Sequence, residues 1–106
     1  MPAVTFIARR EIHAVASDGS SRVIQLGIGT PYKISKDEWA CPLCLHGLHE
    51  HLKDMHGVDS WQALQLAYQL IAQLLGSFVE DGGRLYWPGA GEETSVQELL
   101  PRVGHS

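Results

Sequence analysis

The residues with the widest range of possible chemistry lie in one short segment, positions 41 to 56. This segment holds both cysteines of the chain and four of its six histidines: Cys41, Cys44, His46, His49, His51 and His56. Zinc in a structural site takes four nitrogen or sulfur ligands, and a Cys-x2-Cys turn followed by a histidine pair three to five residues apart can supply them. Cys41 and Cys44 with His51 and His56 have this spacing. The segment therefore predicts a zinc site, with a structural or regulatory role.

The same segment is also typical of a plain β-strand. Every second residue is large and apolar or a cysteine: Trp39, Cys41, Leu43 and Leu45. Because neighbouring side chains of a strand point to opposite faces, positions 41 and 44 would face away from each other and could not share a metal. Cys41 would then be a small core residue, and the histidines would be solvated groups at an edge or in a loop. Sequence alone leaves both interpretations open.

No other residue pattern indicates catalysis. The chain lacks a Gly-x-Ser-x-Gly elbow, a phosphate-binding glycine loop and a His-Glu-x-x-His motif. Its main acidic pair, Glu92-Glu93, falls in a segment that we expect to be a solvated loop. A redox role for Cys41 and Cys44 would need the first cysteine at the amino terminus of a helix, where a strand is expected instead. We therefore predict no catalytic residues, and no cofactor apart from zinc in the first interpretation.

Charge and hydropathy argue against nucleic acid and membranes as partners. The formal charge is −4, and Arg9-Arg10 is the only adjacent basic pair, so no phosphate-binding surface is expected. Residues 60–79 are uncharged and long enough to span a bilayer, but their four glutamines predict a soluble helix. The first ten residues place their positive charges after a short apolar stretch, the reverse of the order in a signal peptide. We therefore expect a cytoplasmic protein.

The clearest expected element is one long amphipathic helix in the second half of the chain. Asp59 is a typical N-cap, Gln62 completes a capping box, and Val58 can pack against Ala63 as a hydrophobic staple. The helix is expected to end between residues 76 and 80. Its apolar residues recur at three- and four-residue spacing: Leu64, Ala67, Ile71, Leu74 and Phe78. This stripe predicts that the helix packs on one face of a sheet.

The segments around the helix predict an α+β fold. Three strands are expected before the helix, over residues 3–16, 22–28 and 39–45. Asp18-Gly19 supplies the tight turn between the first two, and residues 48–56 fit either a helical face or a fourth strand. After the helix, residues 85–87 predict a short strand, and residues 95–98 a capped helical turn. We therefore predict one α+β domain over residues 1–106: a three- to four-stranded antiparallel meander, one long amphipathic helix packed on it, then a short strand and helical turn.

The solvent side of the predicted helix is unusual because it carries amides in place of charges. Its stripe consists of four glutamines: Gln62, Gln65, Gln69 and Gln73. Leu66 and Leu70 flank them, which gives a surface that dissolves in water and yet costs little to desolvate. We therefore predict a non-enzymatic protein-interaction module, with another protein or a second copy as the partner. In the alternative, Leu66 and Leu70 only widen the stripe that faces the core.

Part of the chain resembles a known family. The resemblance rests on Gly57-Val58-Asp59-Ser60-Trp61-Gln62-Ala63-Leu64-Gln65-Leu66-Ala67, preceded by Trp39-Ala40-Cys41-Pro42 and followed by Leu85-Tyr86-Trp87. It is similar to a family of small uncharacterised bacterial proteins that share a Gly-x-Asp-Ser-x-Gln-Ala-Leu-x-Leu-Ala helix start. The resemblance covers roughly the last two thirds of the chain, and it implies no established activity. The second cysteine and the histidines are outside the family's recurring pattern, so the resemblance favours a role for the helix over a zinc site.

Overall fold

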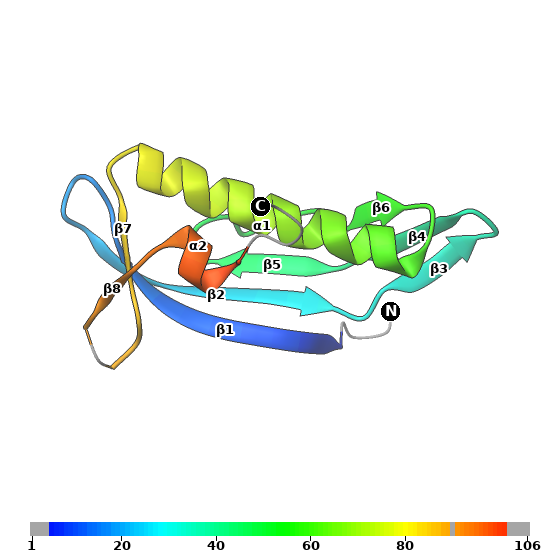
Figure 1. Ribbon diagram of the computed structural model, residues 1–106, viewed down its shortest axis with the longest axis horizontal. Helices are drawn as coiled ribbons and strands as arrows, with labels where there is room; N and C mark the ends of the chain where they lie inside the picture. The colour runs from blue at the N-terminus through cyan, green and yellow to red at the C-terminus, as the bar shows by residue number, and fades with distance from the viewer. Residues whose placement is uncertain (1–4, 90, 102–106) are drawn as a thin grey trace.

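Two antiparallel β-sheets and one long helix make up the fold (Figure 1). The computed structural model describes residues 5–89 and 91–101, so residues 3 and 4 of the first predicted strand lie outside the described residues. The larger sheet has the order β5-β2-β1-β7-β8, with bounds Leu43–His46, Ser21–Gly29, Phe6–Val15, Arg84–Tyr86 and Glu93–Thr94. The smaller sheet has the order β3-β4-β6, with bounds Tyr32–Ser35, Glu38–Cys41 and Met55–Gly57. The helices are α1, Ser60–Glu80, and α2, Val96–Leu99. The predicted α+β class is confirmed.

The hairpin of β1 and β2 forms where the sequence predicts it. Gly19 has a φ of +89°, a left-handed conformation that glycine adopts without strain. The Asp18 carboxylate accepts hydrogen bonds from the backbone N–H of Ser20, at 2.9 Å, and from its hydroxyl, at 2.7 Å. These local bonds fix the turn, and the register of the hairpin then places Ile24 and Leu26 in the core, on the predicted face of β2.

The third predicted strand is divided at Pro42 between the two sheets. Residues before it form β4, which pairs with β3 and β6, whereas residues after it form β5, which pairs with β2. Pro42 has no N–H to donate, but its carbonyl accepts a bond from the Gly29 N–H at 2.8 Å. The prediction of one continuous strand over 39–45 is therefore wrong at this residue, and the proline marks the place where the chain changes sheets.

Three further segments differ from their predictions. Glu93, expected in a solvated loop, lies in β8, which pairs with β7. The sequence predicts no strand over residues 29–36, but they contain β3, which forms a hairpin with β4. In the ambiguous segment 48–56, only Met55 and His56 belong to a strand, β6, and the residues before them form a loop. The small sheet is thus built from segments that are individually short, and their pairing with β4 stabilises them.

Helix α1 lies across both sheets (Figure 1). Its buried side chains form one row at four-residue spacing: Ala63, Ala67, Ile71 and Leu75. The predicted stripe shares only Ala67 and Ile71 with this row, because Leu64, Leu74 and Phe78 are half-buried at its sides. Two alanines in the row let the amino-terminal half of α1 approach the sheets closely. Although α1 is long, no helix within the described ranges is apolar enough to cross a membrane.

The start of α1 forms the predicted cap with one change. The Asp59 carboxylate accepts a bond from the Gln62 N–H at 2.8 Å, and the Gln62 side chain accepts one from the Val58 N–H, also at 2.8 Å. The predicted staple is not formed by Val58, because 61% of its surface is exposed. The close contact with the first turn of α1 is made by Gly57 instead, where an added Cβ atom would overlap the backbone of Gln62 and Ala63.

The chain after α1 returns to both the sheet and the helix. Ser95 caps α2 by accepting a bond from the Glu98 N–H at 3.2 Å, as the sequence predicts. Leu99 and Leu100 are buried in the core, and the Tyr68 hydroxyl of α1 donates to the Pro101 carbonyl at 2.9 Å. The core therefore lies between α1, α2 and one face of the sheets, and the other sheet face is uncovered by any helix of the described chain.

Candidate functional site

The two cysteines point to opposite sides of the fold. Cys41, at the end of β4, is fully buried in the core, and its sulfur lies 3.4 Å from the Gly29 carbonyl oxygen. Cys44, on β5, is paired with Gly27 on the uncovered face of the large sheet, and its sulfur lies 3.8 Å from the Gln25 carbonyl oxygen. Burial raises the pKa of both thiols, so neither favours the thiolate that a metal would need.

The histidines of the cluster are spread over the surface. His46 Nδ1 lies 3.1 Å from Glu50 Oε1, and His56 Nδ1 lies 2.7 Å from Glu38 Oε2. His51 is exposed in the loop before β6. Within residues 5–89 and 91–101, no three side chains of the metal-binding types gather into a group that could hold an ion. The structure thus places Cys41, Cys44, His51 and His56 without bringing them together, and zinc binding stays a prediction from the sequence.

A cluster that the sequence analysis missed lies on the outer face of the small sheet. The Tyr32 hydroxyl on β3 donates to the Asp54 carboxylate, and Glu38 on β4 meets His56 on β6. The bond to Asp54, followed by partial burial, raises the pKa of Tyr32. Each of these polar side chains is bonded to a partner across the small sheet, so the two pairs stabilise the association of its three strands. Only the strand register reveals these pairs, because it brings together side chains that are 22 positions apart in the first pair and 18 positions apart in the second.

The outer face of α1 is exposed and free of charge. All four predicted glutamines are exposed, and the helix has no charged residue between Ser60 and Val79. Gln62 is engaged in the cap, whereas the side chains of Gln65, Gln69 and Gln73 make no hydrogen bond with the described part of the chain. Their amide groups are therefore available to another molecule.

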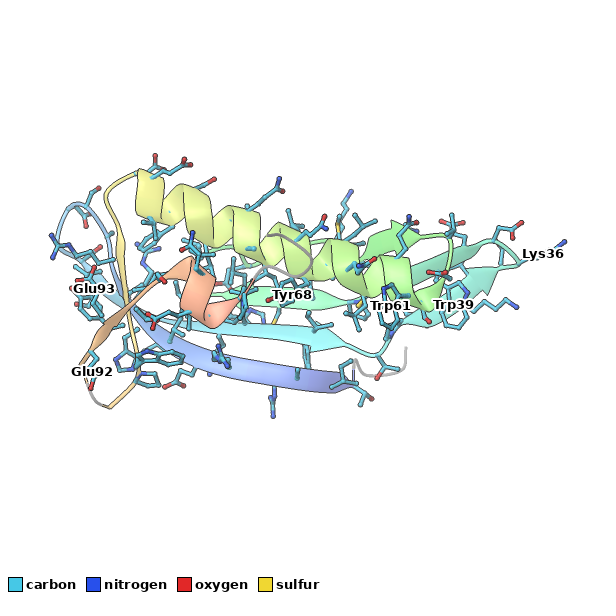
Figure 2. All side chains as sticks on the ribbon, viewed as in Figure 1. Lys36, Trp39, Trp61, Tyr68, Glu92 and Glu93 are labelled. Carbon is cyan, nitrogen blue, oxygen red and sulfur yellow. The ribbon has the colours of Figure 1, made fainter. Side chains whose placement is uncertain are left out.

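Two flanking features complete this face. Trp61 has 72% of its surface exposed, and Figure 2 shows it at the amino-terminal end of α1, in the same region as Trp39 of β4. Leu70 packs against the core, whereas Leu66 is half-buried and is not among the described residues that pack there. The alternative that both leucines widen the core stripe therefore applies to Leu70. We call Trp61, Gln65, Leu66, Gln69 and Gln73 the amide face.

Comparison with known proteins places the chain in a family without assigning an activity. A family model described as a domain of unknown function (DUF6968) matches residues 8–97. Searches of curated proteins and of solved structures found no match. The resemblance to an uncharacterised family is confirmed at this level. Because the match extends over most of the sequence, the chain belongs to the family of this domain of unknown function, DUF6968.

Proposed function

We propose that this protein is a non-enzymatic protein-interaction module and that the amide face of α1 is its binding surface. The observation that carries the proposal is the long exposed helix face without a charged residue from Ser60 to Val79. A helix that only faces water usually carries charged side chains. Charged groups are depleted from the centre of protein interfaces, because burying them costs more free energy than burying amides that find partners.

The chemistry of the amide face suits a protein partner. Each glutamine amide offers two donors and one acceptor oxygen, so it can bond to backbone groups of either kind. Trp61 adds a large apolar surface with one N–H donor, the type of side chain that dominates binding energies at interfaces. From Trp61 to Gln73 the face extends about 18 Å along the helix, at 1.5 Å per residue. It would contribute the centre of an interface, with half-buried Leu66 beside it.

Photo-crosslinking in the cells that naturally make the protein tests this proposal. A photo-reactive amino acid replaces Gln69 on the amide face or, as the control, Lys36, an exposed residue in the turn between β3 and β4. We expect one discrete adduct from position 69 and none from position 36. An adduct with twice the mass of the chain identifies a second copy as the partner.

A second pair of substitutions checks that the adduct reports binding. Gln65→Glu together with Gln73→Glu places two charges on the amide face, and we expect the adduct from position 69 to disappear. Circular dichroism shows whether the variant keeps its helix content. No adduct from position 69, or equal adducts from positions 69 and 36, would overturn the proposal.

A further inference from the structure

One edge of β1 is open over five residues. Strand β1 pairs with β2 along its whole length, but on its other edge it pairs with β7 only through His13, Ala14 and Val15. At the opposite end, the register with β2 shifts between Phe6 and Ala8, which identifies Ile7 as a bulged residue. Between these limits, residues 8–12 have no partner strand on this edge within the described chain. We call them the open window; Figure 1 shows β7 and β8 crossing β1 at only one end.

The open window presents unpaired backbone groups in a fixed order. At the hairpin, the Ala16 N–H donates to the Ser20 carbonyl at 2.8 Å, and the register between β1 and β2 is unbroken from there to Ala8. In an antiparallel pair, alternate residues bond to the same neighbour. The even-numbered residues of β1 therefore bond to β2, and Arg9 and Glu11 turn their N–H and C=O groups to the open edge. Such an edge is a template for another strand.

We propose that the open windows of two copies of this chain pair antiparallel about a twofold axis at Arg10. The window contains five residues centred on Arg10, so an antiparallel copy of itself matches its length. Arg9 then lies opposite Glu11 of the second copy, and Glu11 opposite its Arg9. Both are hydrogen-bonded positions, so the pairing makes four backbone bonds and two cross-strand pairs of opposite charge.

The charges select this register over its neighbours. Because only odd-numbered residues face the open edge, an alternative register must shift by two residues. One such shift places Arg9 opposite Arg9, and the other places Glu11 opposite Glu11. Like charges directly opposite each other destabilise a sheet. The register centred on Arg10 also places one like pair, Arg10 and its copy, opposite each other, but each of these guanidinium groups is held by contacts within its own chain. Among the described residues, Glu11 has only a 3.8 Å approach to the exposed His13 ring, so its carboxylate can take a closer partner.

Arg10, which lies on the axis, is already satisfied by its own chain. Its guanidinium donates to the Leu99 carbonyl at 2.9 Å and lies 5.4 Å from the centre of the Trp87 ring. These contacts hold each Arg10 side chain against its own α2 and Trp87. The arrangement joins two large sheets into one and leaves both copies of α1 on the same side with their amide faces uncovered. It is therefore a second interface, separate from the one proposed above.

Sedimentation equilibrium of charge-swapped variants tests the pairing. We expect the unmodified protein to show a concentration-dependent equilibrium between monomer and dimer. Arg9→Glu and Glu11→Arg each turn both attractive pairs into repulsive ones, so each should raise the dissociation constant roughly tenfold. The double variant Arg9→Glu/Glu11→Arg restores opposite charges across the axis and should restore the dimer. Because both side chains are exposed, the variants should keep the fold.

A disulfide at the axis reports the register directly. In the background Cys44→Ser, Arg10→Cys should form a covalent dimer under mild oxidation, because facing residues at a non-hydrogen-bonded position lie within disulfide range. Gln25→Cys on β2 is the control and should form no covalent dimer, because β2 lies one strand away from the pairing edge. A protein that is monomeric at every concentration, or a double variant that fails to recover, would overturn the pairing. A dimer broken by Gln69→Glu and unaffected at positions 9 and 11 would also overturn it, while supporting the amide face.

Discussion

Gly57 lies so close to Ala63 that a Cβ atom added to the glycine would be 2.5 Å from the Ala63 amide nitrogen. The other near atoms also belong to the helix backbone, which cannot move aside as a flexible side chain would. This approach fixes the end of β6 against the first turn of α1. We therefore expect Gly57→Ala to lower the free energy of unfolding by about 2–3 kcal/mol, because the added methyl forces β6 and α1 apart. Urea unfolding followed by circular dichroism measures the change.

Gly76 is the matched control for that substitution. It lies inside α1, and a Cβ atom there would have no neighbour within 4 Å. Gly76→Ala should therefore raise the free energy of unfolding by about 0.5–1 kcal/mol, as expected for replacing glycine by alanine within a helix. Equal effects from the two variants would contradict the close packing of Gly57.

The cap of α1 gives a second prediction. Asp59→Ala removes the acceptor for the Gln62 N–H, which is bonded at 2.8 Å, and should cost about 1 kcal/mol. Gln62→Ala leaves that bond in place and removes only the acceptor for the Val58 N–H, so its cost should be smaller. Asp59→Asn keeps an acceptor at the N-cap and should be close to the unmodified protein in thermal unfolding. An Asn variant as unstable as the Ala variant would show that the cap bond is not the cause.

Features that depend on neighbours in the sequence could be predicted, whereas pairing between distant segments could not. The Asp18-Gly19 turn and the Asp59 cap follow from local bonds, and both form. The switch of sheets at Pro42 depends on β2 being available to pair with residues beyond it, which no local pattern reveals. For the same reason β3 was missed, because its short segment is a strand only beside β4.

The same distinction applies to the candidate sites. Exposure of Gln65, Gln69 and Gln73 followed from helical periodicity alone, and the structure confirms it. The Glu38–His56 pair and the open window of β1 depend on register and on where β7 stops. From the sequence, the two thiols could either share a zinc ion or face opposite sides of a strand. The structure places them on opposite sides, because Leu43 and Leu45, on either side of Cys44, face the core.

The thiols give a third prediction, which also addresses zinc. Cys44 is half-buried and Cys41 has no exposed surface, and burial raises the pKa of both. An alkylating reagent at neutral pH should therefore modify Cys44 slowly and Cys41 only after unfolding, which peptide mass spectrometry resolves.

Protein purified without a polyhistidine tag should carry less than about a tenth of an equivalent of zinc, because structural zinc needs a complete set of four ligands. One full equivalent, lost in a Cys41→Ser variant, would instead establish the zinc site.

Stability at acid pH gives the last prediction. Glu50 accepts a bond from the Gly47 N–H at 2.6 Å and lies 3.1 Å from the His46 ring, and these two contacts lower the pKa of Glu50 from its ordinary value of 4.5. A carboxyl whose pKa is lower in the folded state stabilises the fold above the unfolded pKa, and this contribution disappears as the pH falls through the folded pKa. Stability should therefore decline as the pH falls below about 4.5.

The substitution Glu50→Gln isolates this contribution. At neutral pH the variant should unfold at a lower urea concentration than the unmodified protein, because the Gly47 N–H loses a charged acceptor. Well below pH 4.5, where Glu50 becomes protonated in the unmodified protein as well, the two midpoints should approach each other. Glu80→Gln, which removes one carboxylate at the exposed end of α1, is the control for the loss of a surface charge. A constant gap between the Glu50 variant and the unmodified protein at both pH values would show that the turn at Gly47 does not depend on the charge of Glu50.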